Sequence, residues 1–170
     1  SFADHDAECR LLVMLDRVNS CTTLVIRDVG DTDDPAVLAA LAQAEIVYFR
    51  GGDQCNFVRW KFSAVHAAVQ ALVARGGGTG GGSAGLAIQG SLAIYDGCTG
   101  SVTSRMALAD PYRRSISFTH DFFTWPHLED TVTDSHFVKR DRMGRLMTFL
   151  RRQQALGRTS SVWGLGIEEG

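Results

Sequence analysis

Ser83 lies in the segment of residues 80–86 (GGGSAGL), where a glycine stands two positions before it and another two positions after it. A serine held on a sharp turn between a strand and a helix needs small neighbours, because the strained backbone passes too close to adjacent elements for a Cβ atom to fit. This G-x-S-x-G spacing is typical of a nucleophile elbow, although a glycine-rich loop that happens to contain a serine has the same pattern. The pattern makes Ser83 the candidate nucleophile.

Ser83 needs a neighbouring general base, because a serine hydroxyl is a poor nucleophile at its free pKa. Histidine is the usual base, since its pKa lies near neutrality, and the chain has five histidines. His136 is the favoured candidate because it follows a predicted strand. His120 and His127 remain alternatives; they lie in the aromatic-rich segment 119–128, where they could instead form a wall for a substrate.

Regular structure must hold these side chains in place, and the apolar residues alternate between a helical and an extended period. The helical pattern predicts helices at 11–18, behind an acidic first turn at Asp4 and Asp6, and at 35–42, 65–75 and 140–156. Short β-branched or apolar runs predict strands at 22–26, 45–49, 115–118, 131–133 and 161–166. Strands that alternate with helices indicate an α/β protein with a doubly wound, mostly parallel sheet.

The ligands of such a sheet bind outside the carboxyl ends of its strands. Three loops follow predicted strands or carry the candidate serine: residues 51–54, the turn at Ser83 and residues 134–137. We therefore expect these three loops to form the functional site.

The composition indicates one ordinary globular domain over residues 1–170, with 45% hydrophobic and 21% charged residues. The net charge of −2 provides no strong field for a nucleic acid or a membrane surface. No run of eighteen apolar residues that could span a bilayer is present. We predict neither a nucleic-acid nor a membrane partner, and the compartment stays open.

The chain has four cysteines, Cys9, Cys21, Cys55 and Cys98. They show no C-x-x-C pair or other spacing of metal ligands, so we predict no metal site. We interpret them as small core residues or incidental thiols, and a disulfide is the weaker expectation.

Three blocks of residues match a known pattern. Residues 48–54 (YFRGGDQ) are similar to F-x-G-G-D-Q, and residues 81–85 (GGSAG) are similar to G-T-S-A-G, with Gly82 in place of threonine. Residues 134–146 are similar to D-Q-H-F-x-x-R-x-R-x-G-R-L, with Ser135 in place of glutamine. In these blocks the chain resembles the cyanophycinase-like branch of the serine exopeptidases, which also contains aspartyl dipeptidase.

The resemblance implies a flavodoxin-like fold of the class I glutamine-amidotransferase type, incomplete at both ends in this chain. It implies Ser83 as nucleophile, His136 as base, and the backbone N–H groups of Gly52 and Ala84 as an oxyanion hole. Family members often form dimers, so a homodimer is possible, and no cofactor is needed. The resemblance also implies a strand within residues 76–82, although six glycines would otherwise predict a loop.

The acid that orients the base and the substrate contacts follow from the same resemblance. The family places an acid shortly after the elbow, where Asp96 is our choice and Asp110 the alternative. The implied substrate-binding residues are Asp53, Gln54, Asp134, Ser135, Arg140, Arg142 and Arg145.

The arginines of the third block also have an independent interpretation. Arg142 and Arg145 are three residues apart and would share one face of the predicted helix. Cations are disfavoured at a helix N-terminus, so a basic cluster there suggests another purpose. Arginine grips a carboxylate with two parallel hydrogen bonds, which favours a peptide substrate with a free carboxylate. The resemblance implies the same, since these enzymes cut β-aspartyl or aspartyl peptide links.

The leading hypothesis is therefore a serine peptidase of cyanophycinase type that releases β-aspartyl-arginine dipeptides or cuts a related peptide. An esterase of the α/β-hydrolase type also fits G-x-S-x-G and the order serine, aspartate, histidine. A nucleotide-binding module would use Gly76-x-Gly78-x-x-Gly81, but this pattern follows a helix instead of a strand. A catalytically silent homologue is the last alternative.

Overall fold

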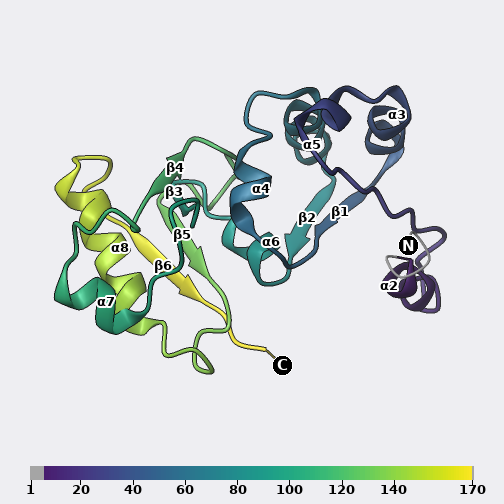
Figure 1. Ribbon diagram of the computed structural model, residues 1–170. Coiled ribbons are helices and arrows are strands. Elements are labelled where there is room, and N and C mark those ends of the chain that lie inside the picture. Colours follow the sequence, from purple (N-terminus) through teal and green to yellow (C-terminus); the bar gives the residue numbers. More distant parts are fainter. Residues whose placement is uncertain (1–5, 170) are drawn as a thin grey trace.

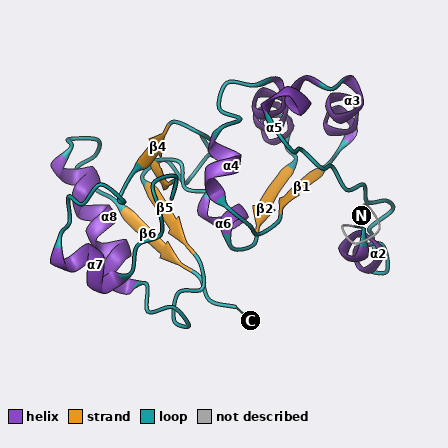
Figure 2. Cartoon of the chain, viewed as in Figure 1, coloured by secondary structure: helices purple, strands orange, loops and turns teal. Residues whose placement is uncertain are grey.

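The computed structural model describes residues 6–169, which form two halves (Figures 1 and 2). In the first half, α3 (Pro35–Gln43) and α5 (Ala64–Ala74) lie beside β1 (Ile46–Phe49) and β2 (Gly78–Gly81). The second half contains β3 (Ala93–Tyr95), α7 (Ser104–Ala109), β4 (Phe118–His120), β5 (Thr131–Asp134), α8 (Met143–Ala155) and β6 (Trp163–Gly166). Between the halves lie α4 (Gln54–Val58) and α6 (Ala84–Ala87). The 3₁₀ helix η1 (Val29–Asp33) precedes α3, and α2 (Ala7–Leu12) lies near the N-terminus.

The strands form pairs. β1 and β2 are parallel, β3 and β4 are antiparallel, and β5 and β6 are parallel. A backbone hydrogen bond of 3.1 Å from Leu92 N to Thr131 O links the start of β3 to β5. The protein is thus mixed α/β, as the sequence predicts. The described residues form three two-stranded sheets and not the single doubly wound sheet that we expected.

Two predicted helices are confirmed together with the local chemistry that forms them. Asp34 precedes α3, and its carboxylate accepts a 2.7 Å hydrogen bond from Ala36 N. This bond satisfies one of the N–H groups that a helix leaves unpaired at its start. At the start of α5, the hydroxyl of Ser63 likewise accepts a 3.2 Å hydrogen bond from His66 N. Gly76, with a φ of +95°, follows the end of that helix.

Four elements differ from the prediction. Residues 22–26 have no regular structure and form no strand with any described residue, because an apolar run becomes a strand only when a partner lies beside it. β4 begins at Phe118 and not at residue 115, and α8 begins at Met143 and not at Arg140. α2 spans Ala7–Leu12, whereas we predicted a helix at 11–18, and it buries none of its residues. Asp4, which we placed in its acidic first turn, lies outside the described residues.

Two hydrophobic cores support the halves. The first joins both halves and contains Leu41, Phe49, Val65, Val69, Ile88, Ile94, Phe122, Phe123 and Trp125. The second packs α7 and α8 against the sheet pairs of the second half and contains Leu92, Ala93, Tyr95, Val102, Ala107, Ile116, Val132, Leu146 and Phe149. The aromatic residues of segment 119–128 are therefore core residues, and the substrate wall proposed for that segment is wrong.

The cysteines also differ from our expectation. Cys9 is bonded to Cys21, and Cys55 is bonded to Cys98, across 12 and 43 positions of sequence. Their Cα atoms lie 5.2 and 4.9 Å apart, which suits a disulfide. Spacing along the chain does not reveal such pairs, because the fold alone brings the partners together.

Residues 6–169 contain neither a membrane-spanning helix nor a metal-binding cluster. No described helix is long and apolar enough to cross a membrane. No group of three or more His, Cys, Asp or Glu side chains within the same residues could hold a metal ion.

His66 provides a test of the first core. Its ring stacks on Phe123 with centroids 5.2 Å apart, and its Nε2 contacts the carbonyl of Phe122. Burial lowers the pKa of His66 from its ordinary value of 6.5, the Phe122 contact raises it, and the charge of Lys61 lowers it further. The unfolded chain therefore binds the proton more readily than the folded chain.

We predict that the free energy of unfolding falls as the pH drops from about 6.5 towards the lower pKa of the folded state. Urea midpoints at about pH 5 and about pH 7.5 should differ more in the wild type than in His66→Gln. The exposed His127→Gln variant is the control and should behave as the wild type does. Equal pH dependence in all three proteins would contradict this role of His66.

Candidate active site

Ser83 sits on the turn between β2 and α6, with φ 53° and ψ −113°. Such a backbone is strained for a residue with a Cβ atom and persists only where the surroundings hold it. A Cβ added to Gly81 would lie 2.3 Å from the carbonyl carbon of Gly85, and one added to Gly85 would lie 2.0 Å from Phe49 O. Both positions of the motif thus require glycine, because the backbone passes too close for a Cβ atom, as the G-x-S-x-G spacing predicts.

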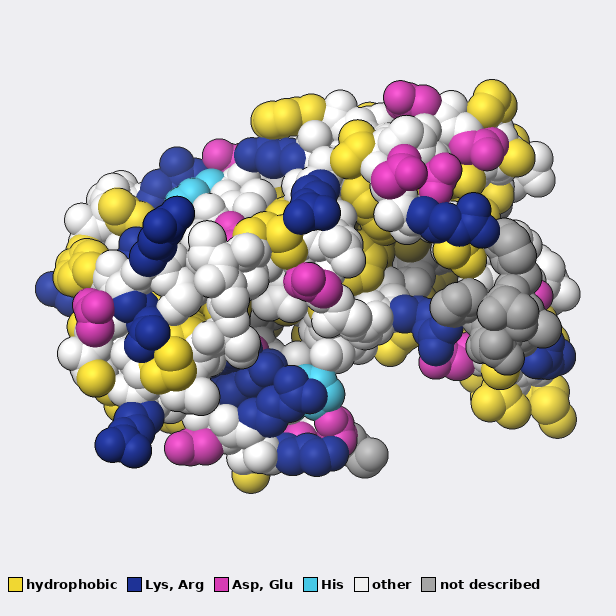
Figure 3. Space-filling model, in the orientation of Figure 1, with side chains coloured by type: hydrophobic (Ala, Val, Ile, Leu, Met, Phe, Trp, Pro, Cys, Tyr) yellow, Lys and Arg dark blue, Asp and Glu magenta, His cyan; other side chains and the backbone are white. Residues whose placement is uncertain are grey.

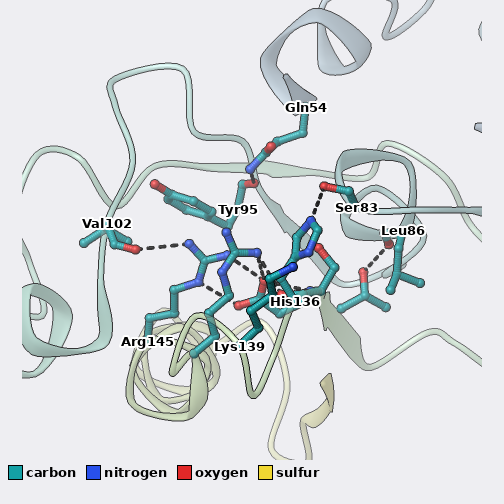
Figure 4. Close-up of polar contacts among 12 residues, drawn as sticks. Gln54, Ser83, Leu86, Tyr95, Val102, His136, Lys139 and Arg145 are labelled. Atoms are coloured by element: carbon teal, nitrogen blue, oxygen red, sulfur yellow. Dashed lines mark hydrogen bonds and ion pairs between the residues drawn. The ribbon is translucent and has the colours of Figure 1, made fainter. Parts of the chain in front are cut away.

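His136 approaches Ser83 from the other half of the molecule. It follows β5, and its Nε2 lies 2.7 Å from the Oγ of Ser83 (Figure 4). This distance lets the imidazole accept the hydroxyl proton directly. His136 also has a positive φ of 47°. The other two candidates lie elsewhere: His120 Nε2 is 2.8 Å from Gln153 Oε1, and His127 is exposed.

Glu169 is the carboxylate that meets His136. Its Oε1 contacts the Nδ1 of His136, and its Oε2 accepts a 2.9 Å hydrogen bond from Lys139 Nζ. The bond from Lys139 lowers the pKa of Glu169 most, and the contact with His136 lowers it further. A carboxylate in this place orients the ring and stabilises the imidazolium that forms when His136 takes a proton.

Glu168 supports the same loop. Its Oε2 accepts a 2.8 Å hydrogen bond from the backbone N–H of Lys139 and also contacts the N–H of Val138. Adjacent residues at the end of β6 thus hold both the ring of His136 and the backbone that follows it.

Asp96, our choice for the orienting acid, has other partners. Its Oδ1 accepts hydrogen bonds from Ser117 Oγ at 2.5 Å and Cys98 N at 3.0 Å, and its Oδ2 accepts one from Thr119 Oγ1 at 3.2 Å. These bonds fasten the end of β3 to β4, so Asp96 supports the fold and does not touch His136. Asp110, the alternative, is exposed and accepts a 3.1 Å hydrogen bond from Tyr112 N.

A signal for Glu169 was present in the sequence. His136 follows a predicted strand at 131–133, and Glu169 follows another at 161–166. The carboxyl ends of neighbouring parallel strands meet at one edge of a sheet. β5 and β6 pair in this way, with Asp134 opposite Gly166.

A small hollow of about 60 Å³ opens beside the Oγ of Ser83. Its lining includes Gly52 and Ala84, the two residues whose N–H groups we expected to form an oxyanion hole. Gly52 has a φ of +149°, which only glycine adopts readily. A Cβ added to Gly51 would lie 3.1 Å from that of Ser83, so the loop passes directly against the serine.

The buried carboxylate of Asp134 binds two of the three arginines in the basic cluster. Arg145 donates to it from Nε at 2.7 Å and from an amino nitrogen at 2.6 Å, and a further nitrogen reaches Val102 O at 3.1 Å (Figure 4). Arg142 adds bonds of 3.2 Å to the same carboxylate and 2.8 Å to Ser135 O. Burial lowers the pKa of Arg142, and the charge of Arg145 lowers it further. Arg145 and Asp134 thus form an internal ion pair, and both residues also line the hollow.

The remaining predicted substrate residues divide in two. Gln54, Ser135, Arg140 and Arg142 line the hollow, whereas Asp53 caps α4 by accepting a 2.9 Å bond from Cys55 N. Arg140 is exposed, and its guanidinium has no hydrogen bond or ion pair with any described residue. On the surface, Lys and Arg side chains gather next to a histidine on the rim of the notch between the halves (Figure 3).

Comparison with known proteins bears on the fold. No protein-family model and no curated protein matches the chain. Among solved structures, the crystal structure of a peptidase from an acI-B1 Actinobacterium is similar, with a TM-score of 0.52 and 18% identity over 84% of this chain. The chain shares the fold of this peptidase. It spans 50% of that structure's length.

Mutation can distinguish the role of Glu169 from that of Asp96. Glu169→Gln should lower kcat for ester or peptide hydrolysis by about 10³-fold or more, because the imidazolium loses its counter-charge. Asp96→Asn should leave kcat within about threefold and lower the melting temperature instead, since that carboxylate joins β3 to β4. The opposite result, with kcat lost in Asp96→Asn and kept in Glu169→Gln, would contradict the geometry.

Proposed function

We propose that the protein is a serine peptidase of cyanophycinase type that hydrolyses β-aspartyl or aspartyl peptide bonds. The observation that carries this proposal is the continuous contact from Ser83 through His136 to Glu169. The motif resemblance and the likeness to a solved peptidase support it. In the whole protein we propose that the three strand pairs belong to one doubly wound sheet of the class I glutamine-amidotransferase type, and that a homodimer forms.

The chemistry follows from the positions of the side chains. His136 Nε2 takes the proton of Ser83 Oγ as that oxygen attacks the peptide carbonyl carbon. The carbonyl oxygen becomes an oxyanion, which the N–H groups of Gly52 and Ala84 would stabilise. The intermediate collapses when His136 returns the proton to the leaving amine. Water then attacks the acyl-enzyme in the same way, with His136 taking its proton and returning it to Ser83 Oγ, and no cofactor takes part.

The charges around the hollow support a substrate with a free carboxylate. Arg145 is neutralised by Asp134, and Arg142 divides its bonds between that carboxylate and Ser135. Arg140 keeps its full set of donors for an incoming group. We therefore propose that Arg140, aided by Arg142, binds the substrate carboxylate, and that Gln54 binds the adjoining peptide group.

The proposed function is tested by hydrolysis of a β-aspartyl-arginine polymer and of β-aspartyl dipeptides. The wild type should release amines and become labelled on Ser83 by a fluorophosphonate, as mass spectrometry would show. Ser83→Ala should lose both properties, whereas exposed Ser101→Ala should keep them. If Ser83→Ala retained more than about a tenth of the wild-type activity, the proposal would be wrong. Cleavage of simple esters alone would favour an esterase.

Arg140 is tested through the charge of the substrate. Arg140→Ala should raise KM for a β-aspartyl peptide by about tenfold, because a charge-assisted hydrogen bond is lost, and should leave kcat nearly unchanged. The same peptide with its carboxylate amidated should bind both proteins equally. Arg151→Ala, an exposed change on α8 away from the hollow, is the matched control. An equal rise in KM for both substrates would show that Arg140 does not bind the carboxylate.

A further inference from the structure

The Cys55–Cys98 disulfide lies next to the proposed catalytic groups. Cys55 is in the first turn of α4 and directly follows Gln54, which lines the hollow beside Ser83. Cys98 lies in the turn after β3, the strand that ends at Tyr95, another lining residue. The bond therefore joins two walls of the site, one formed by α4 between the halves and the other by the turn after β3 in the second half.

The loop that Cys55 anchors is the one that would form the oxyanion hole. Gly51 passes against Ser83, and Gly52, which lines the hollow, has a backbone conformation that few other residues adopt. A flexible glycine pair holds such a position only when its ends are fixed. The hydrogen bond from Gln54 Nε2 to Tyr95 O is long, at 3.3 Å, so it is a weak tether. The disulfide is therefore the stronger tether between α4 and the end of β3.

The same disulfide also helps to fix the position of one half of the molecule relative to the other. Ser83 follows β2 in the first half, and His136 follows β5 in the second, yet their side chains must stay 2.7 Å apart. The disulfide closes a loop across 43 positions of sequence and links α4 covalently to the β3–β4 pair. A movement of one half relative to the other would open the Ser83–His136 contact.

The bond is accessible from one side. Cys98 is exposed, whereas Cys55 is 5% exposed. A dithiol reductant can attack the sulfur of Cys98, forming a mixed disulfide and releasing the Cys55 thiolate. Its second thiol then displaces Cys98. The protein gains two electrons and two protons, and the reductant becomes a disulfide.

We propose that the Cys55–Cys98 disulfide is a positioning element of the active site, whose reduction lowers the rate of acylation at Ser83. This inference rests on the proposed function. This role does not require the disulfide to touch the substrate. It acts through Gly52, whose position beside Ser83 it maintains.

The experiment measures the second-order rate of fluorophosphonate labelling at Ser83, together with kcat and KM, before and after dithiothreitol. The protein used is Cys9→Ser/Cys21→Ser, in which Cys55–Cys98 is the remaining disulfide. This variant should match the oxidised wild type before reduction. After reduction, both the labelling rate and kcat should fall by at least about tenfold while KM changes little, since oxyanion stabilisation acts on the transition state. Reoxidation should restore them.

A second variant, Cys55→Ala/Cys98→Ala, should be slow from the start and insensitive to dithiothreitol. Circular dichroism and melting temperatures, with assays run well below melting, separate this effect from unfolding. Labelling and kcat within about twofold after complete reduction, counted as two free thiols by mass, would overturn the inference. The proposed function fails in a different way: the oxidised protein would then not be labelled at Ser83 at all.

Discussion

The buried ion pair between Asp134 and Arg145 is the interaction on which the rest of the site depends. Their side chains are only 3% and 4% exposed, and two nitrogens of the guanidinium meet both carboxylate oxygens. Removing Asp134 would leave the buried charge of Arg145 uncompensated, which typically costs about 3–5 kcal/mol. The pair ties the end of β5 to α8. The loop between these elements carries His136, so the ion pair determines where the imidazole can lie.

Two strained residues meet where the halves join. Ser83 and His136 both have positive φ angles, and each is held by a different part of the molecule. Close backbone contacts at Gly81 and Gly85 hold the serine, whereas Asp134 and the carboxylates that follow β6 hold the histidine and its loop. Strain of this kind persists only where packing imposes it, and it is concentrated at functional sites. The first core crosses from one half to the other and so supports both residues together.

The parts of this arrangement that sequence could predict depend on local chemistry. The Asp34 cap, the apolar stripe of α5 and the glycines around Ser83 act within a few residues, so their patterns are legible in the chain. The parts that we did not predict depend on contacts between distant residues. Glu169 reaches His136 across 33 positions, the cysteines pair across 12 and 43, and Arg145 forms an ion pair with Asp134, 11 positions away. The predicted strand at 22–26 failed for the same reason, since β structure requires a partner that local sequence does not reveal.

The central claim is that Ser83, His136 and Glu169 act as one catalytic group beside Gly52 and Ala84. The most direct test is a crystal structure of the protein after reaction with a fluorophosphonate. The account predicts a phosphonyl group on Ser83 Oγ, with its oxygen within about 3 Å of the N–H groups of Gly52 and Ala84 and with His136 lying between the adduct and Glu169. An adduct on another residue, or an imidazole that turns away from Glu169 towards a different acid, would contradict it.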